Sequence, residues 1–262
     1  MPAFRDQLNR KVKLSQVPKR IISIVPSQTE LLFYLGLEAE VIGITKFCIH
    51  PAEKFKTVTK IGGTKQLDIE KVRWLNPDLI IANKEENDRL QVEELMNICP
   101  VWISDIFDLD SALQMISSIG DITGRPEQAN DLCKEIKGLF DDLKLPLTIL
   151  KVAYIIWRKP YMLAGKGTFI DCMLQRCGLS NITEAERYPV FNAEALIASN
   201  PDLVFLSSEP YPFARKHIEE FKTILPKVRV VLVDGEMFSW YGSRLLHAPM
   251  YFKRLMNEVM KN

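Results

Sequence analysis

Two similar segments, residues 68–80 and residues 192–204, constrain the fold of this chain more than any other feature. Each begins with a short helical pattern, continues through the tetrapeptide Asn-Pro-Asp-Leu and ends in an apolar run typical of a buried strand. One Asn-Pro-Asp would be an ordinary helix stop and turn. Two copies, each with a glutamate six residues before the Asn, predict two halves of similar build.

Short apolar runs alternate with amphipathic helical stretches along the chain, which is typical of an α/β fold with mostly parallel sheets. In the helix predicted for residues 26–36, Ser27 is the expected N-cap and Glu30 its capping-box partner. Further helices are predicted for residues 167–177 and 244–260. The predicted strands are residues 20–25, 41–45, 79–82, 101–104, 152–157, 203–206 and 228–233.

A longer helical pattern lies between the two repeats, where apolar residues recur at three- and four-residue steps near residues 126–144. About twenty helical residues span roughly 30 Å. The pattern alone leaves two interpretations open, a surface helix that covers one sheet or a rigid bridge between two lobes. The second gives an N-terminal lobe at 1–124, an inter-lobe helix at 125–146 and a C-terminal lobe at 147–262.

Composition and charge exclude several classes of protein. Thirty-four Lys and Arg face thirty-three Asp and Glu, so nothing favours nucleic acid or an anionic membrane as a partner. Five cysteines without a Cys-x-x-Cys pair predict free thiols rather than disulfides or a structural zinc site. The chain has no Gly-x-Ser-x-Gly elbow, and residues 165–168 lack the spacing of a P-loop and instead predict a helix cap.

The first eleven residues contain no apolar stretch or small-residue cleavage site typical of a signal peptide. No apolar run is long enough to cross a bilayer. We therefore expect a soluble chain that stays where it is made. A mature protein that has lost its signal peptide would look similar, so cytoplasmic and exported locations both stay open.

Glu70 and Glu194 are the glutamates that precede the two Asn-Pro-Asp-Leu turns. Each falls in the first turn of a predicted helix, where a carboxylate commonly complements the positive helix end. Alternatively, one exposed carboxylate on the outer end of each lobe would dock into arginine pockets on a symmetric partner.

These features resemble the class III periplasmic binding proteins, which serve ABC importers of vitamin B12, haem and ferric siderophores. The resemblance implies two lobes joined by one long helix, and a glutamate on each lobe that contacts permease arginines. Glu70 and Glu194 are the matching positions. The residues that carry the resemblance are 18–37, 41–45, 61–63, both Asn-Pro-Asp-Leu turns, 165–168 and 238–244.

A ligand is expected beyond the carboxyl ends of the strands, in a cleft between the lobes. Aromatic side chains are dense there, and flat apolar walls suit a corrin or porphyrin ring. The resemblance implies ring contact by Phe47 and ligand contact by residues 236–240, whereas Thr64 stands where a tryptophan is expected. The predicted ligand-binding residues are Phe47, His50, Trp157, Tyr211, Glu236, Met237, Phe238, Ser239, Trp240 and Arg244.

The sequence therefore predicts a monomeric solute-binding protein of an ABC importer for corrinoids, haem or ferric siderophores, and not an enzyme. No cofactor or metal site of the protein is expected, although the ligand itself contains cobalt or iron in these cases, with His50 as a candidate axial ligand. The alternative is a cytoplasmic ligand-sensing module or an enzyme that reuses the same two-lobed fold. A neighbouring permease gene would favour the first.

Overall fold

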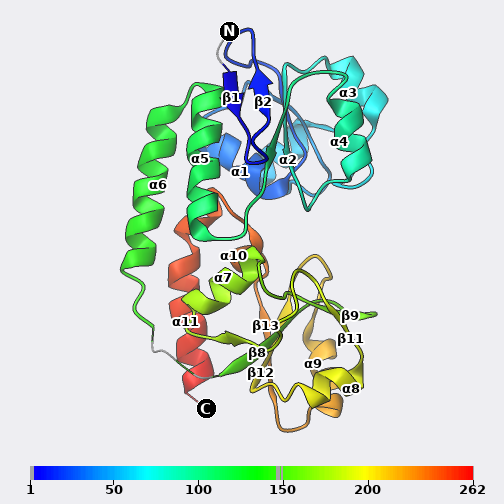
Figure 1. The fold of residues 1–262 in the computed structure, drawn as a ribbon, viewed down its shortest axis with the longest axis vertical. Coiled ribbons are helices and arrows are strands. Elements are labelled where there is room, and N and C mark those ends of the chain that lie inside the picture. The colour runs from blue at the N-terminus through cyan, green and yellow to red at the C-terminus, as the bar shows by residue number, and fades with distance from the viewer. Residues whose placement is uncertain (1–2, 146–147, 149, 262) are drawn as a thin grey trace. The chain divides into compact units, whose positions relative to one another are not determined.

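The computed structural model describes residues 3–145, 148 and 150–261, which form two compact units (Figure 1). Unit 1 comprises the described residues up to Ile106, together with Asp110–Gly138 and Tyr241–Arg244. Unit 2 comprises Phe107–Leu109, Leu139–Trp240 and the described residues from Leu245. The boundary predicted between residues 146 and 147, like the predicted start of the first lobe at residue 1, lies outside the described residues.

The sheet of unit 1 has five strands, all parallel, in the order β5-β4-β3-β6-β7. Short helices connect the strands, as parallel pairing requires. The strands are β3 (Ile21–Ser23), β4 (Val41–Ile44), β5 (Thr59–Lys60), β6 (Leu79–Asn83) and β7 (Val101–Ser104). The helices are α1 (Pro26–Tyr34), α2 (Ala52–Thr57), α3 (Ile69–Leu75) and α4 (Arg89–Leu95).

An antiparallel hairpin, which the sequence did not reveal, precedes this sheet. It consists of β1 (Ala3–Arg5) and β2 (Lys11–Lys13). The amide of Gln7 donates to the carbonyl of Ile103 (3.1 Å), and the indole N–H of Trp102 donates to the carbonyl of Arg5 (3.2 Å). The hairpin and its turn therefore cover the edge strand β7, which would otherwise present unpaired backbone groups.

Two helices of unit 1 lie side by side, α5 (Leu109–Thr123) and α6 (Pro126–Asp141) (Figure 1). Gly120 of α5 approaches Ala129 of α6 so closely that no side chain would fit on the glycine. The thiol of Cys133 also donates to the carbonyl of Leu113. Helix α6 then leads into unit 2, to which its residues from Leu139 on belong. It matches the long helical pattern found near residues 126–144, and it ends three residues before Lys144.

The sheet of unit 2 has the order β11-β9-β8-β12-β13, with β10 also paired to β8. Strands β8, β10, β12 and β13 are parallel, whereas β9 and β11 run antiparallel to their neighbours. The strands are β8 (Lys151–Trp157), β9 (Tyr161–Leu163), β10 (Ser180–Asn181), β11 (Val190–Phe191), β12 (Leu203–Ser207) and β13 (Arg229–Val233).

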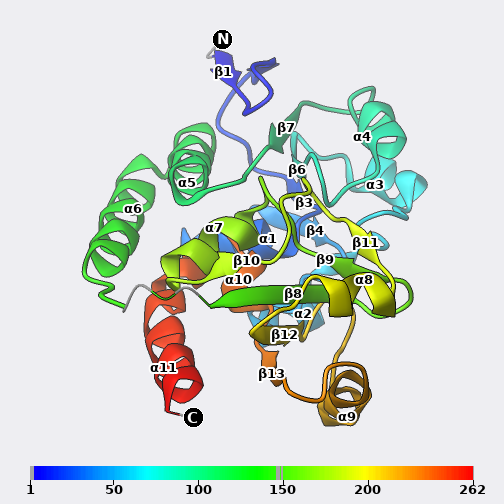
Figure 2. The same cartoon turned by 60° about the horizontal axis from the view of Figure 1, so that its bottom comes forward.

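Helices cover both faces of this sheet, with α7 and α9 on opposite sides of β8 (Figure 2). Ala153 and Ile155 of β8 face the core that includes Leu196 of α8 and Phe221 of α9. Tyr154, between them, points to the other face, where its ring lies 5.1 Å from that of Phe238 in α10. The helices are α7 (Phe169–Arg176), α8 (Ala193–Ala198), α9 (Arg215–Ile224), α10 (Glu236–Ser239) and α11 (Ala248–Met260).

The two Asn-Pro-Asp-Leu turns have the same structural role in the two units. Asn76 and Asn200 end α3 and α8 in the left-handed conformation, with φ of 45° and 48°. The carboxylate of Asp78 accepts from the amide of Arg20 (3.0 Å), and that of Asp202 accepts from the amide of Lys151 (2.7 Å). Each turn thus ties its helix to the start of the neighbouring strand, β3 or β8, as the repeat in the sequence suggested.

Two predictions about helix ends were wrong. Ser27 is not the N-cap of α1, because Val25 occupies that position and Pro26 is the first helical residue. Proline is well suited to that place, since its missing N–H would have had no partner in the helix. The closing helix begins at Ala248 rather than at Arg244, and Pro249 stands in its first turn. None of the described helices is both long and apolar enough to cross a membrane.

Candidate functional site

A buried polar network fills the carboxyl edge of the unit 1 sheet. Parallel strands bring their carboxyl ends to one edge, so residues distant in the sequence meet there. The amide of Asn83 at the end of β6 donates to Ser104 Oγ at the end of β7 (3.0 Å), and the amide of Gln28 in α1 donates to the same oxygen. Asn87 donates to the carbonyls of Ile24 and Thr64, both at 3.0 Å.

Three polar atoms close to this edge are buried without a hydrogen-bond partner among the described residues. They are Ser27 Oγ, Gln28 Oε1 and Ser243 Oγ. Buried polar groups nearly always have a partner, because leaving one unsatisfied costs about 1–3 kcal/mol.

Phe47 and His50 follow β4 at the same edge. The Phe47 ring is half exposed, and Lys46 Nζ lies 5.1 Å from its centre. Between the two residues, the thiol of Cys48 is buried against the hydroxyls of Thr29 and Thr45. Burial raises the pKa of this thiol, which therefore stays protonated at neutral pH. His50 is half buried, and its contact with the metal of a ligand stays a prediction.

The segment Tyr241–Arg244 belongs to unit 1 although it follows α10 of unit 2. Arg244 forms a bidentate ion pair with Glu30 of α1, with N–O distances of 2.6 and 3.1 Å. The hydroxyl of Tyr241 donates to the carboxylate of Glu86. The guanidinium of Arg244, which was predicted to bind ligand, therefore ties the segment Tyr241–Arg244 to α1.

In unit 2, Trp157 and Tyr211 lie at the carboxyl ends of β8 and β12. Their rings meet edge to face, with centroids 5.7 Å apart, and Trp157 is 42% exposed. The amide of Tyr211 donates to the carbonyl of Ile156 (3.3 Å), which fixes the loop after β12 against β8. The structure thus brings two of the predicted ligand-binding aromatics together and leaves the indole accessible.

The predicted ligand loop, residues 236–240, consists of helix α10 and its C-cap Trp240. Phe238 and Trp240 are buried, with exposures of 0% and 5%, and Phe238 packs on Tyr154 and Phe252 in the core. Glu236, Met237 and Ser239 are half buried. Within this loop, these three side chains are therefore the accessible ones.

Glu209, which the sequence did not single out, holds this loop in place. Its Oε1 accepts from Ser239 Oγ (2.6 Å) and from the indole N–H of Trp240 (2.8 Å). Gly235 lies against the Glu209 side chain and Ser207, where a Cβ atom would not fit. Burial raises the pKa of Glu209, Glu236 and Asp234 add to the rise, and the two hydrogen bonds oppose it.

We expect the raised pKa of Glu209 to reduce folding stability as the pH increases. The folded state holds the proton more tightly than the unfolded state, whose carboxyl titrates near 4.5. Stability is therefore lost as the pH rises from that value through the folded pKa. Glu209→Gln keeps an oxygen acceptor but cannot ionise, so the difference in stability between variant and wild type should grow in favour of the variant over this range. Urea unfolding at a series of pH values measures the difference.

Glu219→Gln, at an exposed carboxyl on α9, is the control and should follow the wild-type profile. A constant difference between Glu209→Gln and wild type at every pH would contradict the expectation.

The predicted docking residues Glu70 and Glu194 occupy equivalent places in the first turns of α3 and α8. Both are exposed. The N-caps Asp68 and Asn192 stand two residues before them, and each accepts from the backbone amide three residues on. A docking role for the two carboxylates stays a prediction.

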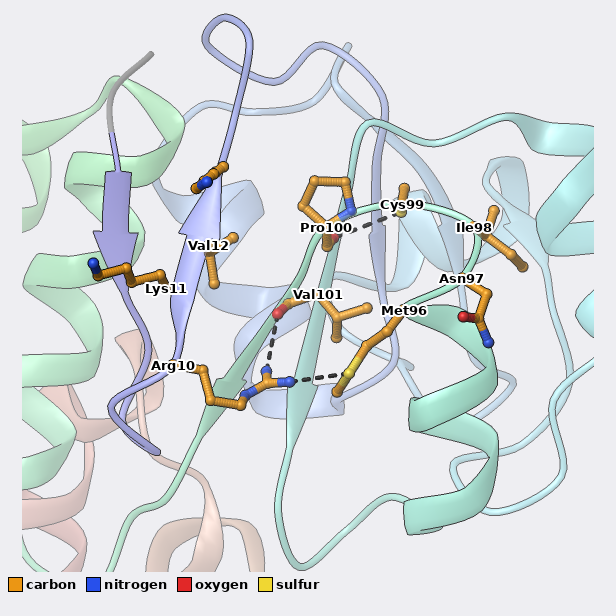
Figure 3. A pocket seen from close by; sticks show the side chains of 10 residues that line it. Arg10, Lys11, Val12, Met96, Asn97, Ile98, Cys99, Pro100 and Val101 are labelled. Carbon is orange, nitrogen blue, oxygen red and sulfur yellow. Dashed lines mark hydrogen bonds between the residues drawn. The ribbon is translucent and has the colours of Figure 1, made fainter.

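A separate cavity of about 450 Å³ lies in unit 1 beside the amino end of β7 (Figure 3). The guanidinium of Arg10 reaches across it to the carbonyl of Val101 (3.0 Å) and to the sulfur of Met96 (3.0 Å). None of the predicted ligand-binding residues lines it. Across the described residues, no group of three or more His, Cys, Asp or Glu is arranged to hold a metal ion.

Comparison with known proteins finds relatives that are all named as binding proteins. The model of the periplasmic binding protein family matches residues 21–224. YvrC of Bacillus subtilis, an uncharacterized ABC transporter substrate-binding lipoprotein, is 27% identical, over 92% of this chain and 81% of the relative. A vitamin B12-binding protein of Pectobacterium carotovorum is 24% identical, over 88% of this chain and 86% of its own.

Solved structures with the same fold include those of a vitamin B12-binding protein and a haem-binding protein. The periplasmic vitamin B12-binding protein BtuF of Vibrio cholerae has a TM-score of 0.78 at 20% identity, over 94% of this chain and 99% of that one. The periplasmic haem-binding protein BhuT, in complex with two haems, has a TM-score of 0.78 at 23% identity, over 91% and 98%. The chain therefore belongs to the periplasmic binding protein family, whose members are binding proteins rather than enzymes.

Proposed function

We propose that this chain captures a large conjugated metal chelate, a cobalamin-like corrinoid, haem or a ferric siderophore, for an ABC importer. The observation that carries the proposal is the pair of accessible aromatic side chains, Phe47 after β4 and Trp157 at the end of β8. Relatives of the chain bind vitamin B12 and haem. The family is periplasmic or cell-surface, and we propose the same location for this chain.

Both kinds of surface that such a chelate needs are available on the two units. Phe47, Trp157 and Tyr211 offer ring faces and edges for a flat conjugated system. The half-buried imidazole of His50 is proposed to hydrogen-bond the amide or carboxylate groups at the periphery of such a ligand. Glu236, Met237 and Ser239 are further proposed contacts.

The proposed partner is the permease of the importer, which would bind Glu70 and Glu194 through arginines. Bidentate arginine–carboxylate bonds fix orientation as well as adding energy. An ABC transporter partner is consistent with the relative YvrC, which is named a substrate-binding lipoprotein of such a transporter. We propose that the chain acts as a monomer.

Trp157→Ala should weaken chelate binding by about 1–3 kcal/mol, because it removes an accessible stacking surface. The measurement is calorimetric titration with cyanocobalamin, cobinamide, haemin and a ferric siderophore, first on the wild type. The matched control is Met250→Ala, since Met250 is also well exposed and lies on α11 but is not among the proposed ligand contacts.

Failure of the wild type to bind any of the four chelates would contradict the proposed ligand class. Equal affinity of wild type and Trp157→Ala for a bound chelate would instead remove Trp157 from the site.

A further inference from the structure

Next to each proposed docking glutamate, the structure places an exposed apolar side chain on the same short helix. Trp74 follows Glu70 by four residues on α3, and Ile197 follows Glu194 by three on α8. Residues three or four apart lie on the same face of a helix. Trp74 is 78% exposed and Ile197 is half exposed. The pairing of a carboxylate with an apolar neighbour thus recurs in both units.

Trp74 contributes little to the folding of unit 1. Val72 and Leu75 are the buried residues of α3 and anchor the helix to the core. No other described residue stacks on the Trp74 ring. The Asp68 cap and the left-handed Asn76 fix the two ends of α3. The exposed Trp74 ring is therefore an apolar surface on a fixed helix. Tryptophan is also among the residues most enriched at the energetic centres of protein interfaces.

The geometry of α3 fits a partner arginine. Such a side chain, paired with the Glu70 carboxylate, can lie flat over an indole one helix turn away, because guanidinium groups both bond carboxylates and stack on aromatic faces. Glu70 already has a neighbouring cation, Arg73, at 3.5 Å. Its carboxylate is 88% exposed, however, and exposed ion pairs on a helix contribute little, so a partner arginine can replace this contact.

We propose that Glu70 and Trp74 form one docking element, which holds a permease arginine between carboxylate and indole. Glu194 and Ile197 form the corresponding element of unit 2, where the isoleucine packs against the aliphatic stem of an arginine but offers no aromatic face. The inference rests on the proposed function. It adds that unit 1 binds the permease more strongly than unit 2 does. It also adds that apolar side chains of the permease surround the arginine that contacts Glu70.

The test measures docking of the full chain to importer permease–ATPase complexes in nanodiscs, using each such complex encoded in the genome that carries this chain. Trp74→Ala should dock on the complex that binds the wild-type chain with an affinity about ten- to thirty-fold weaker than that of the wild type. Trp74→Leu should restore only part of this, because it is apolar but cannot stack a guanidinium. Ile197→Ala should weaken docking less than Trp74→Ala does.

Met250→Ala is the matched control, because Met250 is 76% exposed and lies on α11, which carries neither of the proposed docking glutamates. All four variants should unfold at the wild-type urea concentration and bind haemin and cyanocobalamin as the wild type does. If the wild type docks on no complex, the proposed function and this inference fail together. If the wild type docks and Glu70→Ala weakens docking while Trp74→Ala does not, the inference is overturned and the proposed function stands.

Discussion

Trp240→Ala is expected to lower the free energy of unfolding by about 3–5 kcal/mol, because it empties a site where the ring is almost fully buried. The indole N–H also donates to Glu209 Oε1. Its loss leaves Ser239 as the one remaining donor to that buried oxygen among the residues that the structure describes. Both effects act on unit 2, whose loop after β13 is held in place by this tryptophan.

Urea unfolding checks this expectation, with Trp157→Ala as the matched comparison. Trp157 is a tryptophan of the same unit but is 42% exposed, so its replacement should cost much less stability. Trp240→Phe should recover most of the packing and lose only the hydrogen bond, about 1 kcal/mol. A loss below about 1 kcal/mol in Trp240→Ala, together with weaker binding of haemin or cyanocobalamin, would show instead that the ring contacts ligand.

The repeat allowed much of the fold to be predicted from the sequence. Asn-Pro-Asp-Leu determines local structure by itself, because Asn tolerates the left-handed conformation and Pro stops the helix. The structure uses both copies in the same way, at Asn76 and Asn200. Thr168 likewise caps α7 by accepting from the amide of Asp171 (3.1 Å), as expected for residues 165–168.

Other features could not be predicted, because they depend on contacts distant in the sequence. The N-terminal hairpin has no sequence signal of its own, and only its hydrogen bonds to β7 explain its place. Trp157 ends the apolar strand β8 and Trp240 directly follows α10, yet Trp240 is 5% exposed and Trp157 is 42% exposed. Glu209 precedes a proline and reads as part of a turn, so nothing local indicates that it accepts hydrogen bonds from two residues some thirty positions away.

The double replacement Glu70→Ala and Glu194→Ala should abolish measurable docking on the importer. If each carboxylate pairs with permease arginines, its removal leaves those arginines partly desolvated without a partner, which costs about 2–5 kcal/mol per site. Chelate affinity should hardly change, because each carboxylate lies on the exposed face of its helix. Docking to permease–ATPase complexes in nanodiscs and titration with haemin and cyanocobalamin measure the two properties separately.

Glu184→Ala controls for the general loss of negative charge, since Glu184 is also highly exposed but is not part of either repeat.

The single variants decide whether the sites act together. Because two contacts on one molecule reinforce each other through effective concentration, each single variant should weaken docking strongly and the double variant more than either. Unchanged docking of the double variant would leave both glutamates the simpler role of complementing the positive ends of α3 and α8. Loss of chelate binding with intact folding would instead place them in the ligand site.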